Sequence, residues 1–465
     1  HSTSRRQRQM CIRDSMSSMQ LLPYKQQVSS LLRLGLPIVV GQLGMIILGL
    51  ADTIMIGHHS TEELAAAAFV NNVFNLAIIF ATGFSYGLTP LIGMLQGGGN
   101  TQGIGRVFRN ALAANASVAV LLTAVMYTVY CFVDKLGQPE ELLPHIRPYF
   151  VLQLISLLFI MLFNGFRQFA EGLTDTRTPM WILLGGNALN IFGNYLLIYG
   201  SFGFPEWGLF GAGVSTLVSR IVMLLGFIGV VAVARRYKVY REAILRSRFN
   251  RNDFIQLNAL GWPIALQMGM ETAAFSLSAI MVGWLGSIPL AAHQIMISVS
   301  TIGFMVYYGM GAALAVRVSH FMGQKDFPNL RRAVNSGMGI ILSLAIVASL
   351  FFYLVRTPII YSFTEDHEVM IVVSSLIFSL IVYQFGDALQ ITFANALRGT
   401  TDVKPMMWIA FFSYFIVALP VGYLCGFTWG GGVVGVWVAF PAGLFTAGFL
   451  FWLRFRYRLQ QLMKK

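Results

Sequence analysis

Leu34-Gly35-Leu36-Pro37-Ile38, near the start of this chain, returns 226 residues later as Leu260-Gly261-Trp262-Pro263-Ile264. Other stretches recur at the same spacing, with a one-residue slip before the last: Met55-Ile56-Gly57 and Met281-Val282-Gly283, Leu64-Ala65-Ala66 and Leu290-Ala291-Ala292, Arg106 and Arg332, and Gly172 with Asp175 and Gly399 with Asp402. A duplicated membrane chain typically forms two similar lobes with a substrate path between them. We therefore expect two lobes of the same architecture.

The composition excludes a soluble globular domain, because 56% of the 465 residues are hydrophobic and only 11% are charged. Apolar runs of about 20 residues or more predict membrane-spanning helices. Twelve such runs occur, near 31–57, 64–96, 106–133, 146–170, 179–199, 208–234, 254–284, 289–321, 331–356, 368–396, 405–427 and 432–453. The expected fold is an all-α polytopic membrane protein of two six-helix lobes.

Alternate loops are rich in Lys and Arg, which are retained on the cytoplasmic side of a membrane. The basic loops contain Arg106 and Arg109, Arg167 and Arg177, Lys325 with Arg331 and Arg332, Arg398 with Lys404, and a cluster of seven basic residues between 235 and 251. Both termini are therefore predicted to be cytoplasmic. Six spans is an even number, so both repeats enter the membrane in the same orientation and should be related by an axis along the membrane normal.

These boundaries divide the chain into segments. We expect a cytoplasmic N-terminal segment over 16–30, lobes over 31–234 and 254–453, a basic cytoplasmic linker over 235–253 and a basic cytoplasmic tail over 454–465. The linker is expected to be solvated, with contact to anionic lipid headgroups as an alternative. Residues 1–15 carry four Arg and no apolar core, which is neither a signal peptide nor a helix. We expect a non-native leader there, with the native start at Met16 or Met19.

Several function classes are disfavoured. The net charge of +13 is distributed loop by loop, so topology explains it better than nucleic-acid binding. Three cysteines give neither a disulfide framework nor metal spacing, and the pair His58-His59 beside Glu62 and Glu63 is interpreted as a solvated turn rather than a metal site. No nucleotide-binding, hydrolase or zinc-protease motif occurs. We expect no enzyme activity and no cofactor.

Three carboxylates lie inside the predicted spans: Asp52, Glu271 and Asp387. A charge at the centre of a membrane helix costs roughly 2.5 to 3.5 kcal/mol, so each needs a partner, a proton or a wet cavity. Gln267 and Ser278 share the helical face of Glu271, and Tyr383 and Gln384 lie one turn before Asp387. Such a cluster suits a partly dehydrated Na⁺ or a carried proton.

Other interpretations of these acids stay open. Asp52 is five residues from Gly57 and could be interfacial, whereas Glu271 and Asp387 could only hold helices together. Asp175 and Asp402 are expected to cap helices or pair with Arg177 and Lys404.

The fifth span carries a second polar set, Asn187, Asn190 and Asn194, and Thr216 follows in the sixth. Asn190 and Asn194 are four residues apart on one helical face. They could bond neighbouring helices. If they face Asp52, they form a cation or proton site in the first lobe.

The run from Gly49 to Gly57 around Asp52, the stretch Leu189-Asn190-Ile191-Phe192-Gly193-Asn194, and the segments 262–271 and 383–399 together resemble the multidrug and toxic compound extrusion (MATE) family, in its NorM-type branch. The resemblance covers residues 28 to 460. It implies a Na⁺- or H⁺-coupled antiporter that exports lipophilic, often cationic compounds across a bacterial inner membrane. It also associates Glu271, Asp387 and Tyr383 with the coupling cation, Na⁺ being a candidate there, and Asp52, Asn190, Asn194 and, less securely, Thr216 with the other lobe.

The expected mechanism combines both lines of argument. A hydrophobic cation enters the cleft between the lobes, and Na⁺ or H⁺ from outside then neutralises the acids and lowers its affinity. Cation–π and sulfur contacts favour Phe304, Met305 and Tyr307 as substrate-cavity residues, with Gln267, Ser278 and Gln384. We expect a monomer in contact with membrane lipid. A lipid-linked oligosaccharide flippase, disfavoured by the lack of internal Arg and Lys other than Arg167, Arg220 and Arg317 near predicted helix ends, and a non-transporting receptor or scaffold remain as alternatives.

The repeat sharpens these assignments. Shifted by the repeat spacing, Asp52 lands on Ser278, Glu271 on Met45 and Asp387 on Ile160. No acid has an acidic counterpart, so the shared residues specify the scaffold and the unshared polar residues mark the expected chemistry.

Overall fold

A computed structural model describes residues 21–363 and 365–464, so the leader expected over 1–15 lies outside the described residues. The described part contains twelve helical segments long and apolar enough to cross a membrane, which confirms the expected number. The first half comprises α2 (Tyr24–His59), α3 (Thr61–Ser85), α4 (Leu88–Gly97), α5 (Thr101–Cys131), α6 (Leu143–Gly172), α7 (Arg177–Ile198), α8 (Gly208–Val233) and a short α9 (Lys238–Arg246). The second half comprises α10 (Arg251–Gly283), α11 (Ser287–Gln324), α12 (Phe327–Leu354), α13 (Arg356–Phe363), α14 (His367–Gly399), α15 (Lys404–Phe411), α16 (Leu419–Tyr423), α17 (Gly432–Trp437) and α18 (Ala439–Lys464).

Two spans are less regular than their apolar runs suggest. The second span turns at Tyr86–Gly87 between α3 and α4, and the eleventh contains π-helical turns over 412–418 and 424–428 beside α16. Gly87 and Pro90 stand at the first irregularity and Pro420 at the second, so each run held a helix-breaking residue that the span assignment did not use. Most helices also continue past the predicted spans, because polar residues prolong a helix outside the apolar slab.

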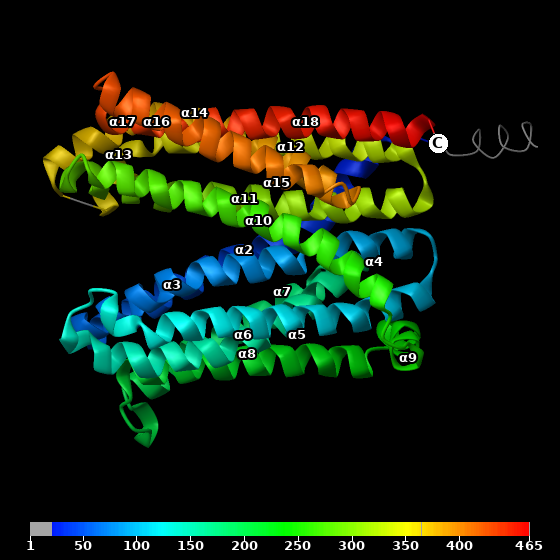
Figure 1. The fold of residues 1–465 in the computed structure, drawn as a ribbon, viewed down its shortest axis with the longest axis horizontal. Helices are drawn as coiled ribbons and strands as arrows, with labels where there is room; N and C mark the ends of the chain where they lie inside the picture. The colour runs from blue at the N-terminus through cyan, green and yellow to red at the C-terminus, as the bar shows by residue number, and fades with distance from the viewer. Residues whose placement is uncertain (1–20, 364, 465) are drawn as a thin grey trace, which may run out of the picture.

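The spans form two lobes, α2–α8 and α10–α18, that lie on opposite sides of the view in Figure 1. The first helix of each lobe crosses toward the other: α2 packs against α11 and α12, and α10 packs against α3 and α5. The lobes meet at the end that carries α4, α9 and the C-terminus, and diverge toward the end that carries α13. We call the first of these the basic end, because the basic loops lie there, and the second the opposite end.

Glycines bring the two lobes into backbone contact at the basic end. A Cβ atom at Gly97 would overlap the carbonyl oxygen of His320, and one at Gly323 would overlap that of Met94. One at Gly87 would lie 2.9 Å from the backbone nitrogen of Gly261. Small residues let membrane helices approach this closely, so the repeated glycines serve as the contact surface between lobes.

The buried hydrophobic residues show the same asymmetry between the two ends. One cluster, which includes Phe74, Phe150 and Leu209, contains only first-lobe residues from the opposite end. The other joins the basic half of the first lobe, such as Ile92, to second-lobe residues such as Phe321. The lobes therefore share a core over the basic half and have separate cores over the opposite half.

Most residues of the linker between the lobes are exposed, but two of its tyrosines make side-chain contacts with the first lobe. The Tyr240 hydroxyl donates to Gln96 over 2.9 Å, and the buried Tyr237 donates to Asp175 over 2.6 Å. Burial and the bond to Asp175 hold the pKa of Tyr237 well above its usual value, so the phenol remains a donor across physiological pH. The Arg and Lys side chains of the linker are mostly exposed, and so are Val239, Leu245 and Phe249.

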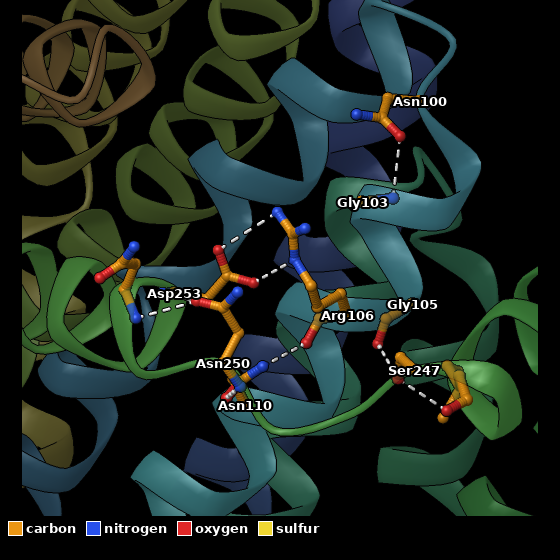
Figure 2. Close-up of polar contacts among 10 residues, drawn as sticks. Asn100, Gly103, Gly105, Arg106, Asn110, Ser247, Asn250 and Asp253 are labelled. Atoms are coloured by element: carbon orange, nitrogen blue, oxygen red, sulfur yellow. Dashed lines mark hydrogen bonds and ion pairs between the residues drawn. The ribbon is translucent and has the colours of Figure 1, made fainter.

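Figure 2 shows how the linker and α10 are fastened to α5. Arg106 Nε donates to Asp253 Oδ2 over 2.6 Å, which joins the first lobe to the first turn of α10. Next to this pair, the backbone N–H of Asn250 donates to Asn110 over 3.0 Å, and Asn250 caps α10 by accepting from the backbone N–H of Asp253. The repeat-related Arg332 donates instead to the Leu22 carbonyl over 2.7 Å, beside α2. Each lobe thus uses the same repeat position to hold the crossing helix at the basic end.

We expect Arg106→Gln to weaken closure of the basic end by about 1 kcal/mol, since the Arg106 side chain is half exposed and its pair with Asp253 is screened by solvent. The measurement is thiol labelling of a cysteine placed at the buried Ser319, in a background without native cysteines. Labelling of the parent should increase with ionic strength, and labelling of Arg106→Gln should be faster and insensitive to salt. Salt-independent labelling in the parent would contradict this role.

Two ion pairs at the basic end differ from the prediction. Asp175 accepts from the backbone N–H of Thr178 in the first turn of α7, which confirms a capping role, but its ion-pair partner is Arg236 at 3.1 Å rather than Arg177. Asp402 pairs with Arg454 through contacts of 2.6 and 3.0 Å, and not with Lys404. Arg454 belongs to α18, which continues through the residues predicted as a tail and buries Leu459 and Leu462.

Candidate functional site

Asp387 lies in α14 and is 1% exposed. Neither of its carboxylate oxygens has a hydrogen-bond partner among the described residues. The side-chain oxygen and nitrogen of Gln384, one turn earlier, are also buried and unpaired there. A buried carboxylate without donors is costly unless a proton or a cation neutralises it.

Glu271, on α10, faces the same region of the second lobe. Its Oε2 accepts from Gln267 Nε2 over 2.9 Å and from Gln390 Nε2 over 3.1 Å. The charges of Glu271 and Asp387 interact electrostatically. The structure therefore groups two carboxylates from different helices, one held by amides and one unpaired. We call Glu271, Asp387, Tyr383, Gln267 and Gln390 the second-lobe group.

Three members of this environment were not predicted. Gln390 lies three residues after Asp387, so the polar stripe of α14 continues further than the sequence interpretation took it. Tyr414 lies within 3.3 Å of Gln390 but sits in a π-helical turn, whose register cannot be derived from spacing. Arg398 was assigned to a loop, but it is buried in the last turn of α14 and donates to Gln267 over 2.8 Å.

Aromatic rings form one wall of this group. Tyr383 is buried, and its ring meets those of Phe275 and Phe440 edge-on, with centroids 6.3 and 6.5 Å apart. Ser278, which shares the helical face of Glu271, is buried beside Phe275 and Tyr414, and no hydrogen bond links its side chain to the Glu271 carboxylate within the described chain.

The residues predicted for a substrate cavity have different surroundings. Tyr307 is buried with an unpaired hydroxyl, and both it and Gln384 lie within 3.5 Å of where a Cβ at Gly303 would stand. Phe304 packs against Tyr308 at 5.5 Å, and Met305 is half-buried. A cavity of about 570 Å³ lies instead at the basic end, where its lining includes Arg106, Asp253 and Lys325 and none of the six predicted residues.

In the first lobe, all four predicted residues meet. Asn194 Nδ2 donates to Asp52 Oδ1 over 2.6 Å and to Asn190 Oδ1 over 3.2 Å, and Asn190 Nδ2 lies 3.1 Å from the Thr216 hydroxyl. With its amide turned over, Asn190 would accept from Thr216 and donate to Asp52 over 3.0 Å, a better pattern of donors and acceptors. Asn187 does not join this first-lobe group, and its buried amide nitrogen has no partner among the described residues.

Basic residues are more internal than the sequence interpretation stated. Arg220 lies in the middle of α8, donates to Gln153 over 3.1 Å and to Ser156, and interacts electrostatically with Asp52. Arg167 is buried and pairs with Glu171 at 2.7 Å. The expectation that they lie near helix ends is wrong for Arg220. The spans therefore contain internal basic residues, and their absence no longer disfavours a flippase. These arginines engage separate partners.

The two groups lie in different lobes and share no side chain. Each combines a carboxylate with amides and hydroxyls, which are the oxygen ligands of hard cations and the partners of a carried proton. No cluster of three or more His, Cys, Asp or Glu that could hold a metal ion occurs within 21–363 and 365–464.

Comparison with known proteins agrees with this architecture. The MatE family model matches residues 37–196 and 263–424, one segment in each lobe. The chain is 30% identical over 448 residues to the multidrug resistance protein NorM of Photobacterium profundum, and the alignment covers 93% of this chain and 96% of that protein.

Solved structures share the fold. An outward-facing multidrug resistance MATE family transporter superposes with a TM-score of 0.85 at 21% identity, over 94% of this chain and 97% of that one. The Vibrio cholerae MATE transporter VcmN, in mutant form, gives 0.85 at 18% identity, over 95% and 99%. The eukaryotic MATE transporter AtDTX14 gives 0.83 at 16%, also over 95% and 99%. From the two matched halves and the NorM relative, the chain belongs to the MATE family, in its NorM-type branch.

Proposed function

We propose that this protein is a cation-coupled antiporter that exports lipophilic, often cationic compounds, with Na⁺ or H⁺ as the coupling ion. The observation that carries the proposal is Asp387, a buried carboxylate with neither oxygen bonded within the described chain, electrostatically coupled to Glu271. A group in that position binds whatever positive charge reaches it. The relatives' names point the same way, since NorM is a multidrug resistance protein.

The donor set suits either ion. The carboxylate of Asp387, the amide oxygen of Gln384 and the phenol of Tyr383 could supply oxygens to a partly dehydrated Na⁺. A single proton on Asp387 would neutralise it equally well. The first-lobe group around Asp52 supplies a second carboxylate with two amides, and we propose that it binds a proton or cation as well.

The lobe arrangement supports alternating access as the transport mechanism. If the basic end faces the cytoplasm, as the positive-inside rule predicts, the shared core at that end closes the cytoplasmic side and the separate cores belong to the outward side. In this conformation the external ion binds and neutralises the carboxylates, the drug cation loses its counter-charge, and the drug leaves. We place the protein in a bacterial inner membrane as a monomer, with both termini cytoplasmic.

This scheme requires that ion and drug weaken each other's binding by the same factor. The affinity of the purified protein for a fluorescent lipophilic cation should therefore fall as Na⁺ is raised or as the pH is lowered. A neutral lipophilic probe of similar size is the control, because its affinity does not depend on a counter-charge. Drug affinity that is unchanged in both titrations would contradict the coupling scheme. Efflux in everted vesicles under an imposed Na⁺ or pH gradient would then identify the ion.

A further inference from the structure

Four titratable side chains meet at the opposite end of the first lobe, outside both groups described above. His59 ends α2, Glu63 is in the first turn of α3, His145 is in the first turn of α6, and Glu206 precedes α8. His59 Nδ1 lies 2.8 Å from Glu63 Oε2, and His59 Nε2 lies 3.0 Å from Glu206 Oε1. His145 Nδ1 lies 3.8 Å from the other oxygen of Glu63. The predicted solvated turn at His58-His59 is therefore a connected chain, which we call the histidine–glutamate chain.

The connectivity of this chain depends on protons. A neutral imidazole donates from only one ring nitrogen, so a ring flanked by two carboxylates can bond both only if the ring is doubly protonated or one carboxyl carries a proton. Loss of that proton leaves a nitrogen lone pair facing a carboxylate oxygen. The contacts on both sides of His59 thus require one more proton than a neutral ring and two carboxylates provide.

The arrangement suits a proton better than a metal ion. His59 lies between the two carboxylates and contacts one with each nitrogen, so the ligands do not converge on a common point. This agrees with the absence of any metal-binding cluster in the part of the chain that the structure describes. The ion-pair partners of Glu63 within that part are the two histidines, with no Arg or Lys.

The histidine–glutamate chain has one end exposed to solvent and one end buried. The Glu206 side chain is 66% exposed, whereas that of Glu63 is 10% exposed. Glu63 lies against Gly208 at the start of α8, where a Cβ would overlap its carboxylate, so the positive end of the α8 dipole faces the Glu63 charge. Three other charged or titratable groups nearby have partners: the His58 ring contacts the Ile54 carbonyl, the Tyr199 ring is 6.2 Å from that of His59, and Arg147 pairs with Asp134. The remaining acids of the adjoining elements are Glu62, Glu140 and Glu141.

The histidine–glutamate chain lies closer to the opposite end than the first-lobe group does. His59 follows Asp52 by seven residues, which places the two on one face of α2 about 10 Å apart along the axis. Asp52 accepts from Asn194 of α7, and Tyr199, just past the end of α7, donates to the Met55 carbonyl over 2.7 Å. Helix α2 therefore carries both His59 of the histidine–glutamate chain and the partly exposed Asp52 of the first-lobe group.

We propose that Glu206, His59, Glu63 and His145 form a proton-binding site that takes protons from the solution at the opposite end and loads the first-lobe group at Asp52. This rests on the proposed function, and it takes the proton as a coupling ion and the opposite end as the external side of the membrane. A proton from water binds at the exposed Glu206 and is held on the His59 ring. Water at the opposite end then carries it the remaining distance of about 10 Å to the partly exposed Asp52. No electron transfer and no bond other than those to the proton is involved.

The test is drug transport by proteoliposomes under a fixed pH gradient, at a series of external pH values. His59→Gln keeps one donor and one acceptor but cannot carry the proton, and we expect it to lose most proton-driven transport, with the greatest loss at alkaline external pH. His58→Gln is the matched control, because that ring contacts only a backbone carbonyl, and it should behave as the parent. Glu206→Gln changes an exposed side chain and removes its charge, and we expect a partial loss of the same kind.

The outcomes separate this inference from the function it rests on. If His59→Gln and Glu206→Gln transport with the parent's rate and pH profile, the proton-binding site is overturned and the antiporter remains. If the parent is driven by Na⁺ gradients and not by pH gradients, the antiporter again remains and the proton-loading role is overturned. Failure of both gradients to drive the parent contradicts the proposed function itself. Drug binding at fixed pH reports whether each variant is folded.

Discussion

Asp387→Asn should abolish efflux while leaving the protein inserted and folded, with drug bound only at the low affinity expected when this carboxylate is neutralised. Asparagine has nearly the same shape as aspartate but carries neither a negative charge nor a transferable proton. Because both carboxylate oxygens lack partners in the described structure, the substitution breaks no hydrogen bond and removes an uncompensated buried charge. We therefore expect thermal stability that is unchanged or higher, together with transport at the level of empty vesicles.

The control is Glu368→Gln, an exposed acid in the first turn of the same helix, which should transport normally. Glu271→Gln should resemble Asp387→Asn in transport, but it weakens the bonds from Gln267 and Gln390 and is expected to lower stability as well. Drug binding to Asp387→Asn should no longer respond to Na⁺ or pH as that of the parent does. Retained efflux in Asp387→Asn would reduce the residue to a structural role.

Gly97→Val should prevent the lobes from closing at the basic end and eliminate most transport. Its Cβ would overlap the backbone carbonyl of His320, which cannot rotate away as a side chain can. Overpacking of this kind costs about 1 to 3 kcal/mol, which changes a two-state equilibrium roughly five- to 150-fold. A cysteine at the buried Ser319, next to Gly93 in the same interface, should become reactive toward thiol reagents from the basic side.

Gly226→Val is the matched control, because Gly226 lies in the middle of α8 with no heavy atom within 4 Å of its would-be Cβ. It should leave both transport and labelling as in the parent. Cys131 and Cys425 are free thiols and must be replaced first. Equal labelling in Gly97→Val and Gly226→Val would show that the backbone contact at Gly97 does not control closure.

The sequence predicted the span number because the bilayer fixes the length of an apolar helix and because each run is separated from the next by polar residues. It also placed Asp52, Asn190, Asn194 and Thr216 correctly as neighbours, since one helical face carries both asparagines and few other polar residues compete for the acid. The break at Tyr86–Gly87 was missed although Gly87 lies in it and Pro90 follows it, because the apolar run was taken as one continuous span.

The missed contacts have a common cause. Asp175 with Arg236, Asp402 with Arg454, and Glu271 with Gln390 all join residues far apart in the chain. Spacing along one helix reports which side chains share a face, and it does not report which face of another helix lies opposite. The histidine–glutamate chain illustrates this limit, because Glu206 is 147 residues from His59.

The glycine contact at the basic end has a kinetic consequence. Where Gly97 meets the His320 carbonyl and Gly87 meets Gly261, the surfaces that separate are backbone. No rotamer must change for these faces to part, and none must be searched for when they meet again, so little side-chain entropy is lost on each closure. If the lobes open and close in each turnover, as proposed, these backbone contacts add no side-chain repacking to that of the shared hydrophobic core.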